Sequence, residues 1–93
     1  MSKFAIIGWH PQLEDLLYFM GEVGGEFRFS PVAGFVKLYS RKKALAIYKK
    51  IVGDHIPDSD SAISVVDWAE FSEDFQIVGI SKEWLKEHNI YGE

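Results

Sequence analysis

Three histidines are the side chains of this sequence that ordinarily titrate near neutral pH, and the sequence contains no cysteine. His10 stands four residues before Glu14, and on a helix that spacing can bring an imidazole and a carboxylate onto one metal ion. One such pair is too common to define a site, so we expect His10 to cap or pack instead. The sequence shows no nucleophile–base pair, glycine-rich phosphate loop or paired metal motif. We therefore predict no catalytic residue, no metal ligand and no cofactor, and a protein that is not an enzyme.

Positive charge is concentrated in residues 37–53, which contain six basic side chains and no acidic one. A helix beginning after Ser40 would align lysines seven residues apart along one side, opposite an apolar face. Basic side chains at the start of a helix face an unfavourable dipole, which a bound phosphate or an acidic partner surface would offset. An ordinary solvated lysine face is the alternative. The partner-binding residues predicted on this helix are Lys42, Lys43, Lys49 and Lys50.

The rest of the chain is acidic, so that the net charge is -4. A protein that coats nucleic acid non-specifically is usually basic overall, so any nucleic-acid contact here must be local. Between residues 67 and 75 acidic side chains are interleaved with aromatic ones, which suits a protein interface better than a pure run of charge does. A solvated turn is the alternative interpretation. The partner-binding residues predicted in this segment are Asp67, Trp68, Glu70 and Phe71.

The elements that must position these side chains follow from hydrophobic spacing. An apolar run at 4–7 predicts a strand, and apolar residues three and four apart after Pro11 predict a helix over 11–20. Alternating residues at 26–29 and 35–39 predict an antiparallel hairpin. The remaining predictions are a helix over 41–52, a loop over 54–61, a strand over 62–68 with a helical turn at 67–71 as the alternative, a strand over 75–80 and a helix over 82–89.

This order of elements predicts one α+β domain spanning residues 1–93. Its first six elements, within residues 4–69, have the ferredoxin-like βαββαβ order, in which an antiparallel sheet carries two helices on one face. Residues 70–93 are expected to add a C-terminal strand and a short helix. A hydrophobic content of 47% supports a packed core, and no apolar run is long enough for a membrane helix. No signal peptide is recognised, so the protein is expected to be cytoplasmic.

The segment after residue 33 carries a resemblance to a known family. Residues 34–38 read Gly-Phe-Val-Lys-Leu and are followed, after five residues, by Ala44. This stretch resembles the third-strand motif of RNA-recognition motif (RRM) domains and the second helix behind it. The other stretches that resemble the family are residues 6–11 (first strand), 14–21 (first helix) and 62–69 (fourth strand). The resemblance implies an RRM-like fold that binds single-stranded RNA by stacking bases on aromatic side chains of an open sheet face.

Alternation along the predicted strands indicates which side chains would line that face. If Val36 and Leu38 point to the core, the residues between and beside them point the other way, and an aromatic ring beside basic groups can stack a base and hold phosphates. At the family's other two aromatic positions this chain has Ile6 and Ala33. Alternatively, the C-terminal strand and helix fold over this face and cover it. The residues predicted to contact RNA are Phe35, Lys37, Arg28, Tyr39 and Ile6.

Two functional hypotheses follow. The first is a binding module of RRM-like fold that takes single-stranded RNA on its sheet face. The second is a protein-interaction or inhibitor module that uses the lysine-rich helix or the acidic segment at 67–74. The exposure of Phe35 and Lys37 distinguishes them, because an open sheet favours RNA and a covered sheet favours a protein partner. The sequence does not determine the oligomeric state.

Overall fold

The computed structural model describes residues 3–53 and 63–90, and the predicted loop at 54–61 lies outside them. The first three strands, β1 (Phe4–His10), β2 (Asp15–Val23) and β3 (Glu26–Ser30), form an antiparallel meander. β4 (Ile63–Asp67) pairs with the other edge of β1. The sheet therefore has the order β3-β2-β1-β4, is antiparallel throughout, and has β1 and β2 at its centre.

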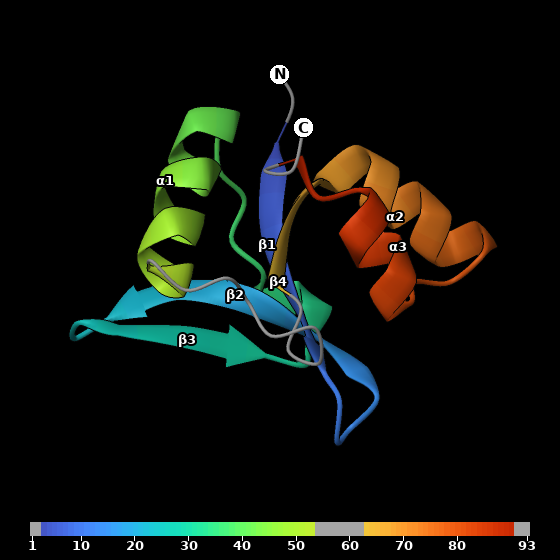
Figure 1. Cartoon of the computed structure of the whole chain (residues 1–93), viewed down its shortest axis with the longest axis horizontal. Helices are drawn as coiled ribbons and strands as arrows, with labels where there is room; N and C mark the ends of the chain where they lie inside the picture. Colours follow the sequence, from blue (N-terminus) through green and yellow to red (C-terminus); the bar gives the residue numbers. More distant parts are fainter. Residues whose placement is uncertain (1–2, 54–62, 91–93) are drawn as a thin grey trace.

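Helices cover both faces of this sheet (Figure 1). A single 3₁₀ turn, η1 (Ala33–Phe35), follows β3 and leads to α1 (Arg41–Val52), which packs on one face. After β4 come α2 (Trp68–Ile77) and α3 (Lys82–Glu87), which pack on the opposite face. The sheet is thus the middle layer of three.

Each face of the sheet has its own apolar core. Along β1, Phe4 and Ile6 point to α1, whereas Ala5 and Ile7 point to α2 and α3. All four are buried, which explains the uninterrupted apolar run at the start of the sequence. The buried core on the α1 side consists of Phe4, Ile6, Phe19, Ala44, Tyr48 and Val65. The buried core on the α2–α3 side consists of Ala5, Ile7, Leu16, Tyr18, Val66, Phe71, Trp84 and Leu85.

The extended residues 36–39, here called the connecting segment, lie between the start of β1 and the middle of β2 and form hydrogen bonds with both strands. The backbone N–H of Lys37 donates to the carbonyl of Phe19 at 3.0 Å. Tyr39 and Phe4 exchange two backbone hydrogen bonds of 2.8 and 2.9 Å. Val36 and Leu38 pack against the α2–α3 side, so the alternation expected from the sequence holds, and Lys37 and Tyr39 face the α1 side.

The predicted helix over 11–20 is wrong, because these residues form a turn and most of β2. Leu13, one member of the expected helical stripe, lies in that turn and is 62% exposed. Tyr18 is buried on the α2–α3 side and Phe19 on the α1 side. A central strand buried on both faces is apolar at nearly every position, so its residues also satisfy the three- and four-residue spacing of a helix.

The predicted strand over 75–80 is also wrong, since α2 extends through Ile77. The alternative interpretation, a helical turn from 67, is confirmed: the side chain of Asp67 caps α2 by accepting two backbone N–H groups at 2.9 and 3.4 Å. The alternation of Phe75 and Ile77 is incidental, because both side chains are at least half exposed. The predicted strand over 35–39 is replaced by η1 and the connecting segment, which makes one isolated bridge. The strands near 4–7, 26–29 and 62–68 and the helices near 41–52 and 82–89 are confirmed.

These changes alter the topology. The observed order is three strands, α1, a fourth strand and two helices, not βαββαβ, and the helices are divided between two faces. The broader expectation of a small α+β chain with an antiparallel sheet is confirmed. Among the described helices none has the length and apolar character required to cross a membrane.

Candidate functional site

A pocket of about 280 Å³ lies between β2, the connecting segment and α1. Its apolar surface comes from Phe19, Tyr39 and Ile47, all partly or fully buried in the α1-side core. Three lysines also line it, Lys37, Lys43 and Lys50, together with Gly21 and Glu22 of β2. We call this site the lysine pocket.

Two separate segments bring the three lysines together. Lys43 and Lys50 are seven residues apart on α1 and therefore lie on one side of the helix, with Ile47 between them. The N-terminus of α1 is fixed by Ser40, whose hydroxyl accepts the backbone N–H of Lys43 at 3.3 Å. Lys37 reaches the same pocket from the connecting segment because residues there alternate between the two faces.

Gly21 supports the position of Lys37. Its backbone has a φ of +115°, and a Cβ built there would lie 3.2 Å from both Cδ and Nζ of Lys37. The lysine side chain thus extends directly over the glycine backbone at the β2 bulge. A larger residue at this position would displace the lysine and would also be strained by the backbone conformation.

The electrostatics of the lysine pocket favour an anion. Nζ of Lys43 lies 5.8 Å from the centroid of the Tyr39 ring, within cation–π range. Burial raises the pKa of Tyr39 above its ordinary value, so its phenol stays neutral and can donate a hydrogen bond. Glu22 is the one carboxylate against three ammonium groups in the lining. Within residues 3–53 and 63–90, no ion pair involves any of the three lysines.

The residues predicted to contact RNA do not form one surface. Ile6 is fully buried in the α1-side core and cannot touch a ligand, so that prediction is wrong. Phe35 is 58% exposed, but it lies in η1 and does not line the lysine pocket. Arg28 is exposed on β3 and pairs with a neighbouring glutamate at 3.1 Å. Lys37 and Tyr39 do come together in the pocket.

The predicted partner-binding residues of α1 are also divided. Lys43 and Lys50 line the pocket with Lys37, which the sequence interpretation had assigned to a different surface. Lys42 and Lys49 are exposed on α1 and do not line the pocket. The structure therefore brings two of the five predicted RNA contacts and two of the four predicted helix lysines into one site.

Most side chains of the predicted acidic docking segment make contacts within the protein itself. Phe71 is buried in the α2–α3-side core, and Trp68 stacks on it with ring centroids 5.2 Å apart. Asp67 caps α2, and Glu70 is exposed and lies 3.4 Å from His88. Phe71 is thus a core residue, and its assignment to a partner surface is wrong; Trp68 is partly buried against the same core.

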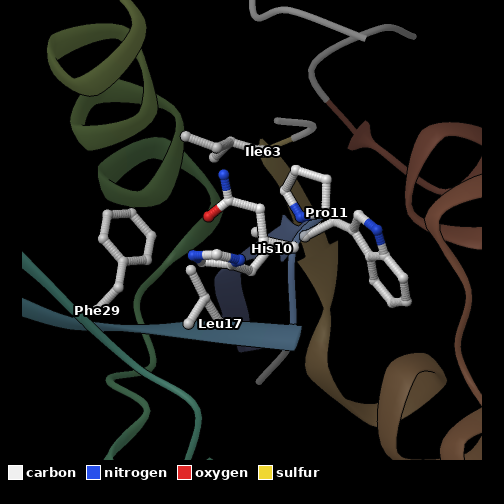
Figure 2. A pocket seen from close by; sticks show the side chains of 8 residues that line it. His10, Pro11, Leu17, Phe29 and Ile63 are labelled. Atoms are coloured by element: carbon white, nitrogen blue, oxygen red, sulfur yellow. The ribbon is translucent and has the colours of Figure 1, made fainter. Parts of the chain in front are cut away.

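A second pocket of about 300 Å³ lies beside the turn between β1 and β2. Figure 2 shows that the ring of His10 sits in it near the apolar side chains of Leu17 and Ile63. Nδ1 of His10 accepts the backbone N–H of Leu13 at 3.2 Å and so stabilises the turn between β1 and β2, where a helix had been expected. None of the residues that line this pocket is Lys, Arg, Asp or Glu, so its chemistry is less specific than that of the lysine pocket.

Sequence reasoning missed the contributions of Gly21, Glu22 and Ile47 to the lysine pocket. The available signal was Gly21 itself, because a glycine inside an apolar strand often marks a bulge or a close backbone approach. Because residues 11–20 were predicted to form a helix, Gly21 was not recognised as part of a strand. Comparisons with protein-family models, curated proteins and solved structures find no match to this chain, so its geometry is the basis for a function.

Proposed function

We propose that this protein is a small binding module that takes an acidic segment of a partner protein in the lysine pocket. The observation that supports this most strongly is the convergence of Lys37, Lys43 and Lys50 from two segments around one pocket. Like charges held close together destabilise one another, and a bound carboxylate relieves that repulsion. A neutral Tyr39 phenol adds a hydrogen-bond donor on the pocket surface.

Helices on both faces of the sheet favour a protein ligand over single-stranded RNA, although Phe35 and Lys37 are themselves exposed. Binding RNA through stacked bases requires exposed aromatic faces next to a basic groove. The ring of Tyr39 is half-buried in the α1-side core and lies beneath Lys43. Helices of the described part of the chain occupy both faces of the sheet, where successive bases would have to stack. Each lysine ammonium is a compact point charge, so it can pair with an individual carboxylate of an acidic protein segment.

The size of the pocket sets the expected scale of binding. A volume of about 280 Å³ lies at the lower end of ligand pockets and suits one or two acidic side chains. Ion pairs at exposed positions contribute about 0.2–1 kcal/mol each. Binding of a short acidic peptide is therefore expected to be weak and to weaken further as salt is added.

The test is a fluorescence-anisotropy titration at low salt with three labelled probes of equal length: oligo-glutamate, oligo-glutamine and single-stranded oligouridine. Oligo-glutamate should bind best. The variant K43E/K50E should weaken that binding about tenfold or more, because it reverses two charges in the pocket. The matched control K42E/K49E makes the same charge change on the same helix outside the pocket and should have a much smaller effect.

Three outcomes would contradict the proposal. If neither anionic probe binds, the lysine pocket is not a ligand site. If the two double variants weaken binding equally, attraction is to the whole helix and not to the pocket. If oligouridine binds more tightly than oligo-glutamate and Phe35→Ala weakens it, the RNA hypothesis is favoured.

A further inference from the structure

Three potential metal ligands meet on the opposite side of the sheet, between α2 and the end of α3. The side chains are Glu70, Asp74 and His88, and one ligand atom from each lies within 4.8 Å of the other two. Glu70 and Asp74 are four residues apart on α2 and so lie on one side of that helix. His88 caps the C-terminus of α3. We propose that this cluster binds a divalent transition-metal ion such as Zn²⁺.

Trp84 orients two of the three ligands. Its indole N–H donates to Oδ2 of Asp74 at 2.7 Å, which fixes the carboxylate and leaves Oδ1 for an ion. Its ring stacks on the imidazole of His88 with centroids 4.0 Å apart and planes 12° apart. Trp84 is itself buried in the α2–α3-side core, so this support is rigid. Ligands held by neighbouring groups in this way are typical of metal sites.

The hydrogen bond of His88 favours the tautomer that a metal ion requires, with the proton on Nδ1. Nδ1 lies 2.9 Å from the backbone carbonyl of Trp84, which can only accept, so Nδ1 carries the proton and donates. In the neutral imidazole with this tautomer Nε2 is the nitrogen that has the lone pair, and it lies 3.4 Å from Glu70. A backbone carbonyl on one ring nitrogen with the metal on the other is a recurring arrangement for metal-binding histidines.

The distance between Nε2 of His88 and Oε1 of Glu70 is 3.4 Å. That exceeds the range of about 2.7–3.2 Å for an N–H···O hydrogen bond. Two ligands bound at about 2.0–2.2 Å to a tetrahedral Zn²⁺ lie about 3.3–3.6 Å apart. The pair is therefore spaced as two ligands of one ion.

The ligand set determines which ions fit. One imidazole and two carboxylates suit Zn²⁺ and other first-row divalent ions, whereas Mg²⁺ prefers an all-oxygen octahedral shell. Glu70 is exposed and the other two ligands are half-buried, so the site opens to solvent. Three protein ligands leave the fourth tetrahedral position for water or for a group of a partner.

The experiment uses the full chain without an affinity tag, titrated with Zn²⁺ and with Mg²⁺ by calorimetry and by thermal unfolding. Wild type should bind one Zn²⁺ and, at ten times Kd, gain roughly 5–10 °C in Tm, with no comparable effect of Mg²⁺. E70Q/D74N keeps an oxygen acceptor for Trp84 and should raise the Kd for Zn²⁺ at least about tenfold. The matched control E73Q/E83Q removes two carboxylates from the same helices outside the cluster and should change Kd little.

A readout independent of stability is the ¹⁵N shift of the His88 imidazole, which should move at Nε2 when Zn²⁺ is added and should not move in E70Q/D74N. The proposal is overturned if wild type binds no Zn²⁺, if H88Q leaves Kd unchanged, or if E73Q/E83Q weakens binding as much as E70Q/D74N does. In the last case the ion is attracted by general negative charge and not by this cluster. The lysine-pocket variants leave these residues untouched, so the two proposals fail independently.

Discussion

The α1 side and the α2–α3 side of the sheet use their charged residues in different ways. On the α2–α3 side, the carboxylates of Asp67 and Asp74 each have a hydrogen-bond partner within the fold, a helix N-terminus and an indole N–H, and Glu70 lies 3.4 Å from an imidazole. On the α1 side, the three ammonium groups of the lysine pocket form no ion pair within the described residues. Charged side chains that already support local structure are poor markers of a macromolecular interface. A group of like charges without partners inside the fold is a better marker of such an interface.

The same contrast holds for aromatic side chains. The rings of the 67–75 segment form a connected set around Phe71, which contacts Tyr18, Trp68, Phe75 and Trp84 with centroids 5.2–6.1 Å apart. They hold α2 and α3 to the sheet. The aromatic residues interleaved with acids at 67–75 therefore belong to an amphipathic helix whose buried ring, Phe71, packs on the sheet.

The largest expected effect is on stability, from Phe71→Ala. This side chain is 2% exposed at the centre of the aromatic set, so its removal should cost about 3–5 kcal/mol of unfolding free energy. Urea denaturation measures that loss. The control is Phe75→Ala on the same helix, where the ring is 50% exposed and the cost should be about 1 kcal/mol or less. Similar losses for the two variants would mean that Phe71 is not the anchor of α2.

A smaller effect that separates stability from binding is expected from Gly21→Ala. The positive φ should make this change cost about 1–2 kcal/mol, and the new Cβ should push Lys37 out of the lysine pocket. Gly25→Ala is the control, since Gly25 also has a positive φ but its Cβ would meet nothing within 4 Å. Denaturation should show comparable losses for both, whereas oligo-glutamate binding should weaken in Gly21→Ala alone. If the two variants bind oligo-glutamate equally well, Lys37 does not contribute to the ligand site.

The smallest expected effect is a dependence of stability on alkaline pH. It arises from two tyrosines, one on each side of the sheet. Burial raises the pKa of Tyr18 and of Tyr39, and Asp15 raises that of Tyr18 further. Because each folded pKa lies above the unfolded value of about 10, the stabilisation is fully present below pH 10 and is lost as the pH rises through the folded pKa. Spectrophotometric titration combined with denaturation between pH 8 and 12, a range chosen around that value, measures this.

The two tyrosines can be separated by substitution. Asp15→Asn should bring the pKa of Tyr18 closer to its ordinary value and leave Tyr39 unaffected, because Asp15 is a cause of the shift at Tyr18 alone. Replacing either tyrosine with phenylalanine should remove part of the loss of stability at alkaline pH. A loss of stability unchanged in both phenylalanine variants would show that other groups cause it.

Local signals made part of the fold predictable from the sequence. Ser40 and Ser81 marked the starts of α1 and α3, and both hydroxyls accept a backbone N–H of the first turn. The β-branched run after residue 62 marked β4. The region from 11 to 23 was not predictable in this way, because the central strand β2 is buried on both faces. Its apolar run is compatible both with the spacing of a helix and with that of a buried strand.

The lysine pocket could be predicted only in part for the same reason. Lys43 and Lys50 follow from helical spacing, whereas the approach of Lys37 depends on the connecting segment pairing with β1 and β2. That pairing is a long-range contact, and local propensities carry no information about it. The cluster of Glu70, Asp74 and His88 likewise depends on how α3 packs beside α2.

The central claim is that the lysine pocket, and not the rest of the charged surface, is the ligand site. The most direct measurement is a ¹⁵N NMR titration of the wild-type chain with unlabelled oligo-glutamate. We predict saturable shifts of the backbone amides of Lys37, Tyr39, Lys43 and Lys50, with Glu70 and His88 unmoved. Shifts spread evenly along α1 and including Lys42 and Lys49, or shifts centred on the α2–α3 side, would contradict the account.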